Sequence, residues 1–320
     1  MPISEIMNLF IFSFNMKKFL FKISFYIVGV LIVFGVLGWF ADGNTDDNYM
    51  HFAVKKPQNI ILGDSRGAQA VLPQLLNQKL GREFDNFALN VVQSPYGQIY
   101  YNALQRKLDP ETKNGLFIIT VDPWNLSLDK NVKKEEDFPE NHSPLKNMHF
   151  YNLSPNYEYL LRNYTRSWFK LYTEREEAGR SNTYLHKNGW MEVTVNMQKD
   201  SIVKREIEKI NFYKQLAQNQ NISQARFNAL EDIIRFLKSK GTVYLVRIPA
   251  SEKMVALEQS YSPDFNEKMK EVSKKYGVYF FDFSSKAKEY QYTDGNHMYK
   301  ESGKAFTAQI ADSILSKTKR

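Results

Sequence analysis

The chain contains no cysteine. This absence excludes disulfide bonds, a thiol nucleophile and a lipid-modified N-terminal cysteine. The sequence also has no P-loop, no dinucleotide-binding glycine pattern and no cluster with metal-ligand spacing, so we expect neither a cofactor nor a metal. It contains no internal repeat and no low-complexity linker. The 320 residues suffice for one large α/β domain together with an anchor and an insertion.

One uncharged, strongly apolar run covers residues 23–41. At about 1.5 Å per residue it reaches roughly 28 Å, close to the hydrocarbon thickness of a bilayer. Lysines precede the run and aspartates follow it: Lys17, Lys18 and Lys22, then Asp42, Asp46 and Asp47. This bias predicts a single-pass helix in the inner (cytoplasmic) membrane, with the N-terminus inside and the rest of the chain periplasmic or extracellular.

A cleaved signal peptide is the main alternative for this run. The run is long for the apolar region of a signal peptide, and it has no clear A-x-A site, which favours a retained anchor. Tyr26 and Trp39 are then expected near the two membrane interfaces.

The formal net charge of the chain is +8. Outside the membrane this charge suits an anionic cell envelope, phospholipid head groups or an acidic polysaccharide. A generic solvated basic surface explains it equally well. Nucleic acid is not an expected partner with this topology.

The segment after the apolar run alternates between strand and helix patterns. The strand candidates are five short apolar runs, at residues 59–62, 84–89, 116–121, 242–248 and 278–283. Helices are expected at residues 68–80, 96–108, 223–240 and 302–316, with a further one opened by Ser262-Pro263. The pattern predicts an α/β fold, a flavodoxin-like three-layer α/β/α sandwich with about five parallel strands, and ligands at the C-terminal strand ends.

The predicted domain organisation has an interruption between the third and fourth strands. Residues 1–22 are a cytoplasmic N-terminus, 23–41 the anchor, 42–57 a spacer, 58–126 and 222–320 the α/β domain, and 127–221 an inserted subdomain. The insertion is rich in aromatic residues, and Lys187-Asn188-Gly189 before residues 190–195 predicts a hairpin. Its aromatic side chains either form a small core of their own or contact sugar rings or the membrane surface.

The first predicted strand runs directly into Gly63-Asp64-Ser65. A serine between a buried strand and a helix exposes its hydroxyl at the sheet edge, beside the free N–H groups of that helix. The hydroxyl needs a base, and histidine suits this because its reference pKa is about 6.5. Of the five histidines only His297 follows the last predicted strand, and Asp294 is placed to hold its ring. We therefore predict Ser65 as nucleophile, His297 as base and Asp294 as orienting carboxylate.

With this pair of motifs, the chain resembles the SGNH (GDSL-type) hydrolase superfamily over residues 59–121 and 242–315. The resemblance implies the same roles for Ser65, Asp294 and His297. In that family two middle blocks supply a glycine and an asparagine as oxyanion donors. The second block here has no glycine at the expected place, and the third block is Asp122-Pro123-Trp124-Asn125. The candidate donors are Asn125 and, as a weaker match, Asn90.

Two arginines lie beside the predicted site. Arg66 follows the nucleophile and Arg247 closes the fourth strand. Each is a candidate for binding an anionic group of the substrate, and each is equally well placed to pair with a structural carboxylate.

The layout is similar to that of membrane-anchored envelope O-acetyltransferases. The resemblance implies a serine-dependent O-acyltransferase or esterase acting on acyl, expected to be acetyl, esters of a cell-envelope glycan, with a multi-span membrane acyltransferase as a partner. An esterase acting on lipid near the membrane shares the same triad. The alternative from another class is a non-catalytic SGNH-fold envelope protein that binds glycan or scaffolds the multi-span enzyme.

Overall fold

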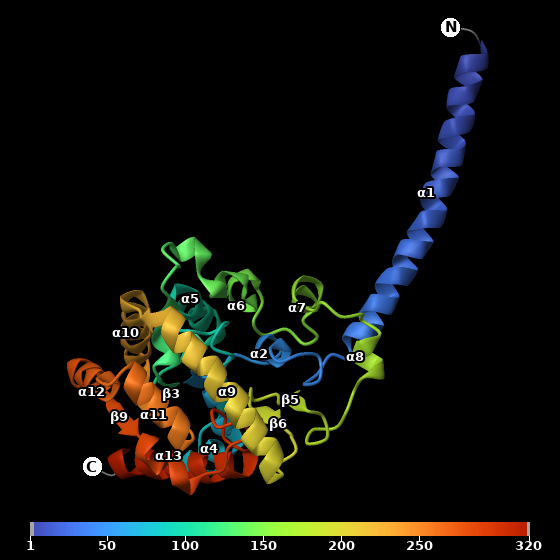
Figure 1. The fold of residues 1–320 in the computed structure, drawn as a ribbon. Coiled ribbons are helices and arrows are strands. Elements are labelled where there is room, and N and C mark those ends of the chain that lie inside the picture. Colours follow the sequence, from blue (N-terminus) through green and yellow to red (C-terminus); the bar gives the residue numbers. More distant parts are fainter. Residues whose placement is uncertain (1–2, 319–320) are drawn as a thin grey trace. The chain divides into compact units, whose positions relative to one another are not determined.

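The computed structural model describes the backbone of residues 3–318 and the side chains of residues 16–317 (Figure 1). The first two residues of the predicted cytoplasmic segment 1–22 lie outside the described residues. The chain divides into two compact units. The first consists of Met1–Ala41 and Thr165–Arg175, and the second of Asp42–Tyr164 and Glu176–Arg320.

The first unit is built on helix α1 (Ile3–Gly38). Its segment Met16–Gly38 is long and apolar enough to cross a membrane, and nearly all of its side chains are exposed. The helix therefore agrees with the predicted membrane-spanning run, although it starts earlier and ends at Gly38 rather than at Ala41. A short helix, α8 (Lys170–Thr173), belongs to the same unit.

The second unit contains a parallel sheet of five strands in the order β2-β1-β3-β8-β9, which confirms an α/β fold. The strands are β1 (Asn59–Leu62), β2 (Phe84–Asn86), β3 (Gly115–Thr120), β8 (Gly241–Arg247) and β9 (Tyr279–Asp282). Every strand begins within one residue of its predicted start, because buried parallel strands appear in sequence as continuous apolar runs. β1 and β3 are buried along their whole length.

Helices pack against β8 and against the edge strand β2. A core cluster joins one set of strand side chains to helices α3 (Ser65–Ala70), α4 (Pro73–Leu80) and α13 (Lys300–Thr318), and it includes Ile61, Ile118, Val246, Phe306 and Ile310. Helix α10 (Gln224–Lys238) packs on β8, and α5 (Gln98–Lys107) packs on α10. Each fully buried aliphatic or phenyl side chain contributes about 1.5–3 kcal/mol, so this core fixes the strand ends that carry the site.

The helix expected at residues 68–80 is wrong in its extent, because two helices occupy this region. α3 starts at Ser65 and ends at Ala70, and α4 starts at Pro73. The residue before a proline is disfavoured in helical conformation, and Leu72 is extended, with ψ 109°. Gly81 ends α4 in the left-handed conformation, as expected.

Between β8 and β9 the structure contains a helix that the sequence did not predict, α11 (Glu252–Tyr261). Helix α12 (Phe265–Tyr276) follows Ser262-Pro263 and is closed by Gly277 at φ 59°. The 3-10 helix η4 (Ser284–Glu289) precedes the loop that carries Asp294 and His297.

The beginning and the end of the segment between β3 and β8 pair as two antiparallel strands, β4 (Ser127–Asp129) and β7 (Gln220–Ile222). The predicted hairpin is confirmed as β5 (Thr183–Leu185) and β6 (Met191–Val193). The longest element of the segment is helix α9 (Lys199–Asn219). The remaining short helices are α2 (Tyr49–Phe52), η1 (Trp124–Leu126), η2 (Glu135–Asp137), η3 (Pro139–His142), α6 (Pro144–Asn147) and α7 (Tyr157–Arg162).

Candidate active site

Ser65 is the first residue of α3, directly after the end of β1. The turn between them depends on Gly63, whose φ is 150° and whose added Cβ would lie 1.8 Å from the Thr120 side-chain oxygen. A Cβ added to Gly67, which lies further along α3, would be 2.7 Å from the same oxygen. Only glycine allows β3 to approach this closely, and the close approach fixes where the serine leaves the sheet.

Asp64 caps α3. Its Oδ1 accepts a hydrogen bond from the Arg66 backbone N–H at 2.9 Å, and its side chain is buried. Burial and the neighbouring Asp122 carboxyl raise the pKa of Asp64 well above its usual range. Asp64 is therefore a turn-stabilising residue in this structure, and the N–H of Ser65 lies at the helix start without an intrahelical acceptor.

The structure brings Ser65, His297 and Asp294 together. Ser65 Oγ lies 2.8 Å from His297 Nε2, and His297 Nδ1 lies 2.8 Å from Asp294 Oδ2. Since an ionised carboxylate only accepts hydrogen bonds, Nδ1 donates to Asp294 and Nε2 is left to accept the serine proton. The side chains of His297 and Asp294 are each 13% exposed, so the pair is shielded but reachable.

The loop carrying Asp294 and His297 is held by its own backbone. Asp294 Oδ1 accepts the N–H groups of Asn296 at 3.0 Å and His297 at 2.8 Å. Gly295 adopts φ 79°, and its carbonyl accepts the Ser251 N–H at 2.8 Å. The Asp-x-x-His spacing therefore lets one carboxylate hold both the histidine backbone and its ring.

Asp294 is more acidic than an ordinary aspartate. Burial raises its pKa, but His297 and, less strongly, Lys209 lower it, and the net pKa lies well below its usual range. Lys209 on α9 places its Nζ 3.3 Å from Asp294 Oδ2. Asp294 is consequently ionised at any pH where the imidazole could act as a base.

Arg66 links the serine turn to the histidine loop. Its Nε and one terminal nitrogen donate to Asn296 Oδ1 at 2.8 and 2.5 Å, and the same nitrogen donates to Glu258 Oε1 at 2.5 Å. Because Arg66 directly follows Ser65 and Asn296 directly precedes His297, this contact fixes the distance between the predicted nucleophile and the predicted base.

Glu258 holds both candidate arginines. It also accepts the Trp124 indole N–H at 3.0 Å and the Arg247 guanidinium at 3.1 Å. Arg66 and Arg247 are 2% and 5% exposed. Their observed partner is thus a structural carboxylate, which was one of the two alternatives open for each. Sequence reasoning missed Glu258 and Asn296. Asn296 lies inside the Asp-x-x-His motif, but Glu258 lies on the unpredicted α11 and gave no signal.

The two candidate oxyanion donors differ in how far their amide N–H groups are already hydrogen-bonded within the protein. The Asn125 amide is fully buried, and its Nδ2 donates to the Thr120 carbonyl at 3.3 Å and to Asp122 Oδ2 at 3.4 Å. Both of its amide hydrogens are therefore engaged within the protein. Asn90 lies in the loop after β2, where its Oδ1 accepts the N–H groups of Val92 and Gln93. Its Nδ2 donates to no other described residue, so it is the freer of the two donors.

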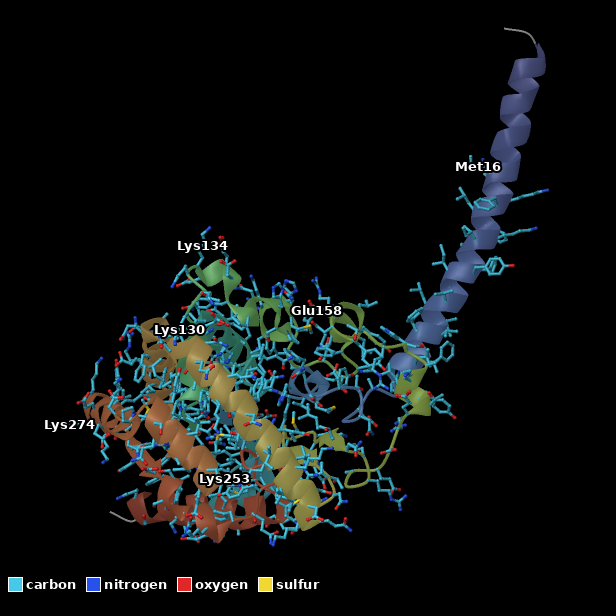
Figure 2. The ribbon with its side chains drawn as sticks, viewed as in Figure 1. Met16, Lys130, Lys134, Glu158, Lys253 and Lys274 are labelled. Atoms are coloured by element: carbon cyan, nitrogen blue, oxygen red, sulfur yellow. The ribbon has the colours of Figure 1, made fainter. Side chains whose placement is uncertain are left out.

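Helix α9 lines the cavity next to the triad. This cavity, of about 330 Å³, is bounded by Asp294 and by four side chains of α9, Arg205, Glu208, Lys209 and Phe212. Arg205 Nε donates to the Thr293 carbonyl at 2.7 Å. Lys253 of α11 (Figure 2) bonds to Glu206 of α9 at 2.6 Å, which fixes the helix against the site.

A larger cavity, of about 780 Å³, lies at the opposite edge of the sheet, around Asn59, Phe84 and Gly115. The described residues contain no group of three or more histidine, aspartate or glutamate side chains that could hold a metal ion. The chemistry that the triad end can perform is nucleophilic attack by an activated hydroxyl.

A comparison with protein-family models finds no match for this chain, and a comparison with curated proteins finds none either. The assignment of function therefore rests on the residues and geometry described above.

Proposed function

We propose that this protein is a membrane-anchored serine acyltransferase or esterase of the SGNH type. It acts on acyl esters, expected to be acetyl esters, of a cell-envelope glycan. The observation that carries the proposal is the relay of two 2.8 Å hydrogen bonds from Ser65 through His297 to Asp294. The strand order β2-β1-β3-β8-β9 supports a flavodoxin-like three-layer sandwich, in which ligands bind at the C-terminal strand ends.

The first half-reaction forms an acyl-enzyme. Ser65 Oγ attacks the ester carbonyl carbon while His297 Nε2 takes the hydroxyl proton, and a tetrahedral oxyanion forms. The ester C–O bond then breaks, and the leaving alcohol takes the proton from His297. Asp294 keeps the ring in the required tautomer and stabilises the imidazolium.

The second half-reaction regenerates the serine. His297 takes a proton from the acceptor hydroxyl, whose oxygen attacks the acyl carbon, and Ser65 Oγ leaves with that proton. A sugar hydroxyl as acceptor gives a transferase, and water gives an esterase. The Ser65 N–H and the Asn90 Nδ2 are the donors we assign to the oxyanion.

The apolar helix Met16–Gly38 supports single-pass anchoring, with the lysines at its N-terminal end inside and the second unit outside. A multi-span membrane acyltransferase is the partner that would deliver the acyl group to Ser65. No diffusible cofactor is required by this scheme.

The function is tested with the full chain in detergent, an activated acetyl ester and a polysaccharide acceptor. Mass spectrometry measures acetylated sugar against free acetate. We expect acetyl release or transfer that disappears in Ser65→Ala. Equal turnover by the wild type and Ser65→Ala would overturn the proposal.

One observation favours the non-catalytic alternative, in which the fold binds glycan or scaffolds a partner. Asn125, the family-like donor, is engaged with Thr120 and Asp122 rather than free. Glycan binding that is unaffected by Ser65→Ala, together with no acetyl chemistry in the wild type, would support this alternative.

A further inference from the structure

Residues Thr165–Arg175 belong to the same compact unit as α1, although they lie far from it in the sequence. The Trp168 ring packs edge-on against Phe34 with 4.7 Å between centroids, and Tyr172 packs against Phe40 at 4.9 Å. The Arg175 guanidinium lies 5.6 Å from the centre of the Phe40 ring. This segment of the insertion therefore returns to the last turns of α1.

The contact lies where the apolar span ends. Phe34 and Phe40 lie on either side of Gly38, the last residue of the span. Trp39, between them, is 75% exposed. Tryptophan and tyrosine concentrate at membrane–water interfaces because their rings are apolar and their N–H and O–H groups are polar. Six aromatic residues thus gather at the end of the helix, and we call them the aromatic collar: Phe34, Trp39, Phe40, Trp168, Phe169 and Tyr172.

The collar leaves apolar surface uncovered. Phe169 is 63% exposed and Tyr172 59% exposed, whereas Leu171 between them is buried. The nearby cations Arg166 and Lys170 both pair with Glu174. Because these two cations share one carboxylate and Arg175 is also exposed, the segment combines exposed aromatic rings with a small net positive charge, which suits the head-group and acyl boundary of a bilayer that carries anionic lipids.

We propose that residues 165–175 form a second membrane attachment, with their aromatic side chains inserted among the lipid head groups around the end of α1. This inference rests on the proposed membrane anchor. The chain passes between the two units three times, at residues 41–42, 164–165 and 175–176. Anchoring at both segments would hold the catalytic unit to the membrane through three connections, and would restrict it to membrane-proximal acyl donors and acceptors.

The absence of cysteine allows a clean test on the full chain in lipid nanodiscs. Single cysteines carry an environment-sensitive fluorophore at three positions: Phe169→Cys in the collar, Val28→Cys in the middle of the span, and Lys274→Cys on α12 (Figure 2). Tyr172→Cys is a second collar position, in case the first variant misfolds. Quencher lipids carry a nitroxide either near the head group or deep in the acyl chain.

We expect the shallow quencher to remove roughly half of the fluorescence at 169, and the deep quencher to act mainly at 28. Neither should affect 274. A label at 169 or 172 that escapes both quenchers, while 28 is quenched, would overturn the second attachment and leave the anchor intact. Failure of both quenchers at 28 would instead overturn the anchor, and with it this inference.

Discussion

The parallel sheet has a cavity and buried charged residues at both ends of its strands, the C-terminal edge and the N-terminal edge. The residues found at these two edges differ. At the C-terminal edge a cavity of about 330 Å³ adjoins Asp294 of the triad. At the N-terminal edge the cavity is larger, about 780 Å³, yet the described residues lining it include no serine and no histidine. The comparison shows that the candidate site is identified by the convergence of a hydroxyl, an imidazole and a carboxylate, and not by the size of a cavity.

Each edge also contains a buried cation in a different role. At the C-terminal edge Arg66 joins the residue after the nucleophile to Asn296, beside the base. At the N-terminal edge Lys107 lies 3.6 Å from Asp85 and donates to the His51 carbonyl at 2.8 Å. The first cation links the segments that carry the candidate catalytic residues, whereas the second holds elements together away from them.

The largest expected effect is that of Ser65→Ala. Removal of the nucleophile should lower the rate of acyl release by about 10³-fold or more, because covalent catalysis is lost. The measurement is hydrolysis of an activated acetyl ester by the full chain in detergent. Lys56→Ala, in the larger cavity, is the matched control and should leave the rate unchanged. Equal losses in the two variants would remove the distinction between the edges.

Arg66→Met and Lys107→Met form a matched pair. Each removes a buried cation. Lys107→Met leaves Asp85 unpaired and should lower the free energy of unfolding by about 3–5 kcal/mol, whereas Arg66→Met leaves Glu258 paired with Arg247 and should cost less. Only Arg66→Met should also lower kcat of the folded protein, because Asn296 and the histidine loop lose their link to Ser65. Denaturant unfolding gives the stability, and kcat is measured below the unfolding transition.

The contrast fails if Lys107→Met lowers kcat as much as Arg66→Met does. Arg66→Lys provides a finer version of the test. It retains the charge but cannot reproduce the forked contacts to Asn296 and Glu258, so kcat should remain below the wild-type value.

At the N-terminal edge, His51 should determine how the free energy of unfolding changes at acid pH. Burial, followed by the charge of Lys107, lowers the pKa of His51 from 6.5 to about 3. Between these pH values the unfolded chain binds a proton that the folded protein does not, so this contribution to stability is lost as the pH falls below 6.5. His51→Leu should therefore preserve roughly 2–3 kcal/mol of unfolding free energy on acidification from about pH 6.5 to about pH 4.5.

Asp85 provides the control of opposite sign. Burial raises its pKa from 3.8 to about 6, so its contribution to stability is present at low pH and is lost as the pH rises through this range. Asp85→Asn should steepen the acid destabilisation that His51→Leu relieves. Parallel pH slopes for wild type and His51→Leu in chemical denaturation would contradict the assignment.

The smallest effect is expected for Lys209→Met. Lys209 lowers the pKa of Asp294 but ranks below His297 as a cause, and its side chain is 31% exposed. Loss of its charge should reduce kcat/KM by less than about tenfold, because solvent screens partly exposed pairs. A reduction comparable to that of His297→Ala would place Lys209 in the catalytic machinery itself.

The sequence predicted the strands, and the proximity of the three candidate residues, where local patterns determine structure. Continuous apolar runs identified the five strands, and chain order placed Ser65 and His297 after strand ends that meet at one edge of the sheet. Pro73 could have revealed the break between α3 and α4 as well, since the rule for the residue preceding a proline is local.

The supporting residues could not be predicted in the same way. Glu258 occupies a core-facing position of α11 that hydrophobic periodicity assigns to an apolar residue, and this hides both the helix and its role. Its bonds to Arg66 and Trp124 join residues far apart in the chain. The contact of Trp168 with Phe34 is of the same kind. Such pairings depend on tertiary packing, which one sequence does not encode in any short pattern.

The proposed function depends above all on Ser65 being a nucleophile that is activated by His297. The most direct measurement treats the full chain in detergent with a fluorophosphonate probe and locates the adduct by mass spectrometry. We expect an adduct on Ser65 that is lost in His297→Ala, while that variant keeps the wild-type unfolding transition. An absence of adduct on Ser65, or equal labelling in His297→Ala, would contradict it.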